Sequence, residues 1–416
     1  MTGTAPTEYV VDRRESLVES TLDLLAMDSS NPPGETGEAV THLESELDGL
    51  GVEVERFTAD PMKPNLLVTV PGEREQTLLY NGHLDTVPFD PNAWTYDPLG
   101  ERMDNRLYGR GATDMKGQVA AMLETIRAFA ETDTTPPLTL QFAFVSDEEV
   151  AGDAGLRALL EANYIDADAC VIGEPTCKAN RHSVTVADRG SIWLTLEGQG
   201  NAAHGSRPVL GVNAIDRVYR AVETIRGRLG EKRLDIDPAH RPIIEESVEY
   251  YAPTMGEQTA RDLFQYPSIN LGVLEGGDAV NRVPPWARAE LDVRLSPGVP
   301  TGEILSDLRA CVDDCKGVSI ADVSWSVGTA ELPNSPLVEA VVSTAEKVTN
   351  SRVYRRSATG GGDAKLLRNA GVPTVEFGLG SATVHAVDEY TTVDALADNA
   401  TVYTTVPFRL SSDGGL

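Results

Sequence analysis

Residues 138–149 read LTLQFAFVSDEE, an apolar stretch that ends directly at three acids. The apolar part, 138–145, is short and rich in aromatic and β-branched residues, which is typical of a buried strand. Residues 169–174 read ACVIGE and repeat the arrangement, with Glu174 just beyond the apolar part. Polar groups that follow the strands of an open α/β sheet gather at one edge, where such sheets bind their ligands. The two stretches therefore predict a functional site at that edge.

Helices and strands alternate on either side of these two stretches. Further strands are expected at 52–57, 66–70 and 77–80, and helices at 17–27, 38–50, 116–130, 156–162 and 392–402. Alternation of this kind predicts an α/β domain with a mixed, mostly parallel sheet.

The pattern changes after about Val186. Strands at 191–197, 268–274 and 287–294 with a helix at 213–228 predict a smaller α+β unit, and helices at 303–315, 337–348 and 364–369 resume the α/β pattern. We therefore expect a discontinuous catalytic domain of residues 1–186 and 296–416, interrupted by an inserted dimerisation or lid domain at 187–295. Residues 231–267 are charged and irregular in this interpretation, and no function follows from them.

The composition excludes some functions. The formal net charge is −29, and only 7 of the 35 basic residues are lysine. Such acidity indicates a protein of a salt-loving organism, although an acidic mesophilic enzyme stays an alternative. It argues against nucleic-acid binding, which needs basic patches. No apolar run approaches the roughly 20 residues of a membrane span. With a polar N-terminus and four cysteines expected to be reduced, we expect a cytoplasmic protein.

Histidines and carboxylates recur at the predicted strand ends and loops. They are His83 and Asp85, Asp114, Glu148 and Glu149, Glu174, and a late His385. Imidazole and carboxylate without thiolate suit zinc, cobalt or manganese. In extended chain, residues two apart point the same way, so Asp85 can receive or orient the second ring N–H of His83. Adjacent residues point apart, so one of Glu148 and Glu149 can bind metal while the other faces substrate.

Each of these signals has a simpler explanation when it is taken alone. Asp114 could cap the helix that follows it, Glu148 and Glu149 could form a solvated loop, and His385 could lie on the surface. Taken together and in this order, two histidines and three carboxylates predict a pair of metal ions bridged by Asp114. Glu148 is then free to deprotonate a water held between them.

The motifs that carry these residues resemble the M20 family of two-metal peptidases, which includes acetylornithine deacetylases, succinyl-diaminopimelate desuccinylases, aminoacylases and glutamate carboxypeptidases. They are Gly82 to Pro88, Gly109 to Gly117, Asp147 to Glu149 and Gly173 to Thr176. The resemblance implies that His83 and Glu174 bind one metal and that Glu149 and His385 bind the other, with Asp114 bridging. It also implies that Glu148 is the general base, that Asp85 supports His83, and that a cis peptide bond follows Asp114.

The resemblance also extends to the inserted domain and to the C-terminal part of the chain. It implies that His204 crosses a homodimer to stabilise the oxyanion, and that Asn281, Arg294 and Gly361 contact substrate. Asp388 stands where the family often has Asn. Desuccinylases carry two arginines where this chain has Asp188 and Arg189, and an Asp at 188 would repel a second substrate carboxylate.

The function expected from the sequence is that of a co-catalytic amidohydrolase with two divalent metal ions, zinc first, with cobalt and manganese as alternatives. It would release an amino acid from a small-molecule N-acyl amino acid. A metallo-carboxypeptidase or dipeptidase is the alternative within the family. A non-catalytic binding protein on the same fold is the alternative from another class, and such a protein would be expected to have lost Glu148 or a ligand. No nucleic-acid or membrane partner is expected.

Overall fold

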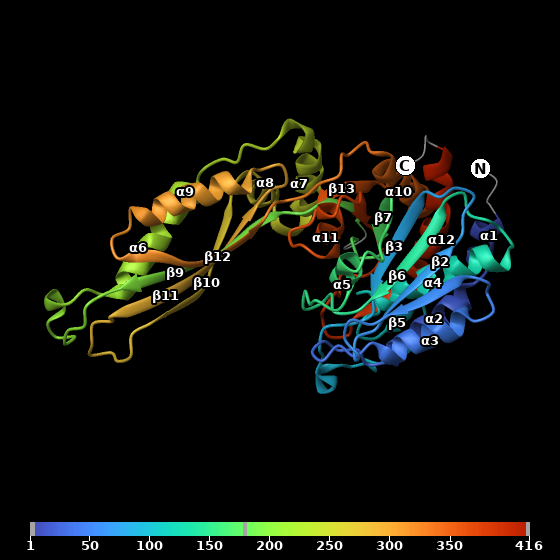
Figure 1. Ribbon diagram of the computed structural model, residues 1–416, viewed down its shortest axis with the longest axis horizontal. Coiled ribbons are helices and arrows are strands. Elements are labelled where there is room, and N and C mark those ends of the chain that lie inside the picture. The colour runs from blue at the N-terminus through green and yellow to red at the C-terminus, as the bar shows by residue number, and fades with distance from the viewer. Residues whose placement is uncertain (1–4, 178–180, 413–416) are drawn as a thin grey trace. The chain divides into compact units, whose positions relative to one another are not determined.

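The computed structural model describes residues 5–177 and 181–412 of the chain (Figure 1). The chain divides into two compact units. The first comprises Met1–Val186, Glu331–Arg355 and Gly361–Leu416, and the second comprises Ala187–Ala330 and Arg356–Gly360.

An eight-stranded mixed sheet forms the centre of the first unit. Its strands lie in the order β1 (Glu53–Phe57), β2 (Asn65–Val70), β6 (Thr139–Val145), β3 (Thr77–His83), β7 (Ala169–Ile172), β14 (Thr374–Glu376), β8 (His182–Ala187) and β13 (Val353–Ser357). The central strands β6, β3, β7 and β14 are parallel, whereas β1, β2 and β8 pair antiparallel. The mixed α/β class predicted from the sequence is confirmed.

Helices cover both faces of this sheet, because successive strand residues point to opposite sides. Leu79 of β3 packs with Leu159 and Leu367, which lie on α5 (Leu156–Glu161) and α11 (Asp363–Asn369). The next residue, Tyr80, donates a 2.6 Å hydrogen bond to the carbonyl of Tyr403 on the other face. Five helices pack together on that second face: α1 (Ala5–Val11), α2 (Arg14–Leu25), α4 (Lys116–Glu131), α10 (Pro336–Thr349) and α12 (Val393–Ser412).

The remaining elements of the first unit lie in its N-terminal half and near the end of the chain. Helix α3 (Gly37–Leu47) contacts β1. A small antiparallel sheet joins β4 (Glu101–Met103), β5 (Arg106–Tyr108) and β15 (Tyr390–Thr392). This second sheet brings the segment before Asp114 next to the segment after His385.

The second unit is a four-stranded antiparallel sheet with helices on one face (Figure 1). The strands are β10 (Ser268–Gly276), β11 (Trp286–Leu295), β9 (Gly190–Gln199) and β12 (Val318–Ser326). Alternate residues of β9 are buried, among them Ile192 and Leu194, whereas Trp193 between them is exposed. The buried residues pack against α6 (Ala214–Ile225) and α9 (Thr301–Asp313).

The boundary expected at residue 295 is wrong. Strand β12 pairs with β9 along its length, from Val318 opposite Gly198 to Ser326 opposite Ser191. Helix α9 contributes Leu305 and Leu308 to the core of the second unit. Residues 296–330 therefore belong to the second unit. An edge strand and its helix have the same apolar pattern in either unit, so their assignment depends on long-range pairing.

The sequence suggested that residues 231–267 are irregular, and this expectation is also wrong. They contain α7 (Arg241–Met255) and α8 (Glu257–Gln265). Ile244 and Val248 are buried four residues apart, and Phe264 is buried in the core of the unit. The many charged residues and Pro253 concealed this helical spacing in the sequence.

Among the helices described, none combines the length and the apolar character that crossing a bilayer requires. All four cysteines are free thiols, and Cys170, Cys177 and Cys311 are buried.

Candidate metal centre

Three neighbouring parallel strands of the first unit end at one edge of the sheet and carry three of the five predicted ligands, His83, Glu149 and Glu174. His83 is the last residue of β3 and lies opposite Val145, the last residue of β6. Asn81 lies opposite Ile172, so Glu174 follows β7 at the level of His83. The acids 147–149 follow β6 after a single residue, Ser146. The edge predicted from residues 138–149 is therefore the edge at which these side chains meet.

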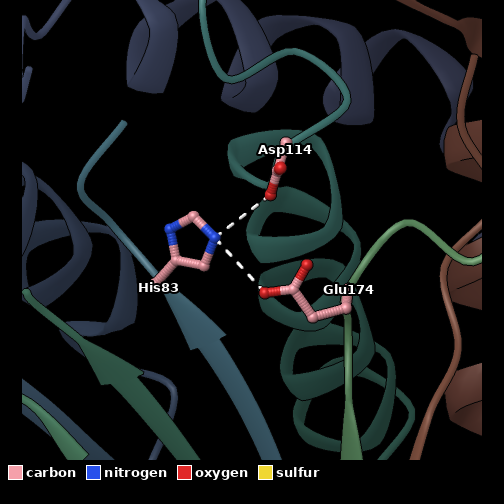
Figure 2. Close-up of side chains that lie close together, drawn as sticks. All are labelled: His83, Asp114 and Glu174. Atoms are coloured by element: carbon pink, nitrogen blue, oxygen red, sulfur yellow. Dashed lines mark hydrogen bonds and ion pairs between the residues drawn. The ribbon is translucent and has the colours of Figure 1, made fainter. Parts of the chain in front are cut away.

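His83, Asp114 and Glu174 form the first group of candidate ligands (Figure 2). The Nε2 atom of His83 lies 3.1 Å from Oδ1 of Asp114 and 3.5 Å from Oε1 of Glu174. Asp114 lies in the turn before α4, after Gly109 and Gly111, which both have positive φ angles. The peptide bond between Asp114 and Met115 is cis, as predicted.

Asp114, Glu149 and His385 form the second group. The Nε2 atom of His385 lies 3.0 Å from Oδ2 of Asp114 and 3.3 Å from Oε2 of Glu149. Asp114 thus offers one oxygen to each group, which is the geometry of a bridging carboxylate. His385 has a positive φ of 60° and comes from the loop between β14 and β15.

The site concentrates buried carboxylates. Burial and the charge of Asp114 raise the pKa of Glu174 to about 8. Burial would also raise the pKa of Asp114, but hydrogen bonds from His385 and His83 hold it well below its usual range. Hydrogen bonds to Asp114 and Glu149 raise the pKa of His385 to about 10. The carboxylate of Asp114 thus contributes to the raised pKa of both Glu174 and His385.

The residues present fit divalent metal ions. The Oε1 atom of Glu149 is buried and has no hydrogen-bond partner within the described residues. A buried carboxylate oxygen without a partner is costly unless a cation binds there. Both groups offer imidazole nitrogen and carboxylate oxygen, the ligands of zinc and similar ions. His83, Asp114 and Glu174 would hold one ion, and Asp114, Glu149 and His385 the other.

Asp85 supports this site in a different way from the one expected. The Nδ1 atom of His83 is 2.8 Å from the backbone oxygen of Asp85 and 3.8 Å from its carboxylate. The carboxylate instead accepts hydrogen bonds from the backbone N–H groups of Glu148 and Glu149, both at 3.2 Å. The main chain of Asp85 therefore orients His83, while its side chain holds the turn that carries Asp147, Glu148 and Glu149, the acidic turn.

Glu148 belongs to neither ligand group and lies beside both. Burial, followed by the charge of Glu174, raises the pKa of its carboxyl well above the usual range. A Cβ atom on Gly362 would come within 2.9 Å of Oε1 of Glu148. Gly362 therefore approaches the acid, whereas Gly361, the residue singled out from the sequence, approaches only the side chain of Lys365.

Sequence reasoning missed the residues that hold Asp114 from behind. One carboxylate oxygen of Glu389 accepts the N–H groups of Thr113 and Asp114, at 2.9 and 3.0 Å. The other accepts a hydrogen bond from Arg110, which also donates to the carbonyl of His385. The only signal for Glu389 in the sequence is its place four residues after His385.

The other predicted residues lie in the second unit, where His204 and Asn281 come together. The N–H of Gly205 donates to the carbonyl of Asn281, and an isolated antiparallel β-bridge pairs the backbones of His204 and Arg282. Both side chains are exposed. The ring nitrogen Nδ1 of His204 is 2.8 Å from the hydroxyl of Ser206.

Arg294 does not join His204 and Asn281 within this unit. Strand β11 begins at Trp286, five residues after Asn281, and Arg294 lies eight residues further along the strand, roughly 27 Å at the usual rise. Its guanidinium is paired with Asp292 at 2.7 Å. Asp188 is buried and accepts a 2.5 Å hydrogen bond from Thr329. The predicted repulsion of a second substrate carboxylate by Asp188 stays a prediction.

Known proteins resemble this chain along most of its length. The model of peptidase family M20/M25/M40 matches residues 79–408. A succinyl-diaminopimelate desuccinylase of Rhodospirillum centenum is 30% identical over 385 residues, which are 90% of this chain and 92% of the relative. An acetylornithine deacetylase of Edwardsiella ictaluri is 30% identical over 374 residues, 86% of each chain.

The fold is also found among solved structures. The M20 family metallo-carboxypeptidase Sso-CP2 of Sulfolobus solfataricus aligns with a TM-score of 0.75 at 20% sequence identity. The alignment covers 94% of this chain and 99% of that one. At this identity the match establishes a shared fold over both units.

Proposed function

The chain belongs to peptidase family M20/M25/M40, and on this premise we propose that it is a metal-dependent amidohydrolase that releases an amino acid from an N-acyl amino acid. The relatives named desuccinylase and acetylornithine deacetylase support this substrate class. Members of the family hydrolyse amide bonds, so the chain is a hydrolase rather than a binding protein. The presence of Glu148 together with every expected ligand agrees with this.

One observation carries the proposal. The two oxygens of Asp114 face two different histidines, at 3.1 and 3.0 Å, and each histidine faces a different glutamate. A single metal ion would need only one of these groups. Two groups that share one bridging carboxylate support a dinuclear site, with zinc as the first choice and cobalt or manganese as alternatives.

The metal ions, when bound, would polarise the scissile carbonyl and lower the pKa of the attacking water. Glu148 would take the proton of that water and pass it to the leaving amine. Its position beside both ligand groups and its raised pKa suit a group that must first accept and then release a proton. Asp85 and Glu389 would keep His83, Asp114 and the acidic turn in place.

We propose further that the enzyme is a homodimer in which His204 of the partner subunit stabilises the oxyanion. The exposure of His204 supports this, as does the absence of any hydrogen bond from its Nε2 atom within the described residues. Asn281, Arg294 and Gly361 are proposed to contact substrate. Arg294 would exchange its pairing with Asp292 for the substrate carboxylate.

A carboxypeptidase or dipeptidase activity is the second candidate, favoured by the fold match to a metallo-carboxypeptidase. Because Asp188 is buried, we keep a desuccinylase among the N-acyl amino acid hydrolases of the first candidate. We also propose a cytoplasmic location, supported by the four free thiols, and a salt-loving source, supported by the net charge of −29.

A release assay separates these substrates. Metal-loaded protein is incubated with N-acetylornithine, N-succinyl-diaminopimelate, other N-acyl amino acids and dipeptides, and the free amine is measured. Turnover of an N-acyl amino acid above that of every dipeptide supports the proposal. Preferential turnover of dipeptides would replace it with the second candidate. No amine release from any of them by fully metal-loaded protein would contradict both.

A further inference from the structure

The acidic turn that carries Glu148 is held by contacts from distant parts of the first unit. Asp147 has a positive φ of 66°. Its carbonyl accepts the N–H of Gly152 at 2.9 Å, and its Oδ2 atom accepts the N–H of Ala154 at 3.3 Å. The turn is therefore closed around the Asp147 carboxylate, and a change at that carboxylate alters the backbone on which Glu148 stands.

Two buried carboxylates flank the turn, that of Asp147 on one side and that of Asp85 on the other. The side-chain nitrogen of Asn31 connects them, because it donates to Oδ2 of Asp85 at 2.8 Å and to Oδ1 of Asp147 at 3.0 Å. Lys63 adds an ion pair to the same oxygen of Asp147 at 2.5 Å. Asn31 thus donates to both carboxylates, and Lys63 donates to that of Asp147.

These donors are themselves fixed in position. Asn31 is 3% exposed, and its backbone N–H donates to the carbonyl of Thr86 at 2.8 Å. Gly34 follows with a φ of +76°, and a Cβ atom there would lie 2.6 Å from the amide carbon of Asn31. The side chain of Lys63 is 17% exposed. Two buried like charges without such partners would repel each other and lose solvation, which is costly.

We propose that Asn31 and Lys63 are positioning residues that set the direction of Glu148 by holding the carboxylates of Asp85 and Asp147 in place. Neither residue touches substrate or metal in this account. Asn31 spaces the two carboxylates with its two N–H bonds, and Lys63 neutralises the one nearer to it. The inference rests on the proposed role of Glu148.

Three variants test it. Asn31→Asp keeps the shape of the side chain but removes both donors. Lys63→Met removes the charge at similar length, and Lys63→Arg keeps the charge. For all of them, kcat, KM, bound metal per chain and melting temperature are measured with excess metal.

Loss of a group behind the reacting residues typically costs 10- to 100-fold, so we expect kcat to fall by about that factor in Asn31→Asp and about tenfold in Lys63→Met. KM should stay within about threefold and two metal ions should remain bound, because the ligands are untouched. Lys63→Arg should recover most of the kcat lost in Lys63→Met.

Thr36→Val is the matched control. Thr36 is buried and lies, like Asn31, in the loop before α3. Its hydroxyl donates a 2.8 Å hydrogen bond to the carbonyl of Pro64, which follows Lys63 in the loop before β2, but it touches neither Asp85 nor Asp147. It should lower the melting temperature and leave kcat near the wild-type value. If Asn31→Asp does not fold, the two Lys63 variants decide the question.

Wild-type kcat in Lys63→Met or in folded Asn31→Asp would overturn the proposal. So would a loss that added metal restores in full, or a kcat of Lys63→Arg no higher than that of Lys63→Met. Failure here is separable from failure of the proposed function: if Glu148→Gln is inactive while these variants are normal, only the positioning roles are wrong. If Glu148→Gln is itself active, the proposed function is wrong as well.

Discussion

The backbone carbonyl of Asp85, rather than its carboxylate, lies within hydrogen-bond distance of the Nδ1 atom of His83, at 2.8 Å against 3.8 Å. The two functions of the residue are thereby separated. Its main chain fixes the tautomer of His83, a proposed metal ligand, and its side chain is free to bind the backbone of Glu148 and Glu149. A substitution at Asp85 should therefore act on the acidic turn more than on His83.

The variant Asp85→Ala tests this separation. It removes three hydrogen bonds to the carboxylate, from the backbone N–H groups of Glu148 and Glu149 and from the side chain of Asn31, each worth about 1.5–3 kcal/mol to a charged acceptor. It leaves the carbonyl that orients His83. We expect kcat to fall by roughly 10- to 100-fold, while mutation of His83 itself should abolish metal binding at its site. Isothermal titration of metal-free protein with zinc compares the two. Loss of the His83 metal in Asp85→Ala would show that the carboxylate is needed for that histidine.

Glu148 and Glu149 are neighbours with different expected roles, so their variants should differ. Glu148→Gln should keep both metal ions and the fold but lose about 100- to 10,000-fold in turnover, because a general base contributes by that factor. Glu149→Gln should weaken metal binding, since Glu149 faces His385 at 3.3 Å. Turnover and bound metal are measured on the same samples. Near-normal turnover of Glu148→Gln would reject its role.

Much of the site was predictable because it follows strand ends. An apolar run followed by a polar side chain indicates both the burial of the strand and the edge at which the side chain lies, which is why the sequence predicts His83, Glu149 and Glu174 at one edge. Asn31 and Lys63 lie in loops with no periodic pattern, so only the fold brings them to Asp147. The role of the Asp85 carbonyl could not be read from residue types, since every residue has one.

The domain boundary shows the same limit. Strand β12 and helix α9 look like a continuation of the α/β pattern, and only the pairing of β12 with β9 places them in the second unit. Local pattern predicts that an element exists, whereas its partner is decided by contacts far away in sequence.

Salt should stabilise the protein. The net charge of −29 makes the folded chain repel itself at low ionic strength. The screening length falls from about 10 Å at 0.1 M salt to about 3 Å at 1 M. We expect the melting temperature, followed by circular dichroism, to rise markedly between low and molar potassium chloride. A flat or falling curve would reject adaptation to high salt.

The partner role of His204 is testable by mixing subunits. His204→Ala and Glu148→Gln should each be nearly inactive alone, since one oxyanion donor contributes about 100- to 1,000-fold. In a mixed dimer, the subunit with intact Glu148 would receive an intact His204 from the partner. Statistical reassembly should restore up to about a quarter of wild-type activity. Verified mixed dimers without recovery would mean that His204 does not act across subunits.

The central claim is that Asp114 bridges two metal ions. Anomalous diffraction from crystals of zinc-loaded protein, recorded above and below the zinc edge, tests it most directly. We expect two peaks per chain, one beside His83 and Glu174 and one beside Glu149 and His385, with one oxygen of Asp114 on each. Treatment with a chelator should remove both peaks together with the activity. A single peak, no peak, or two peaks of which Asp114 contacts only one would contradict the account.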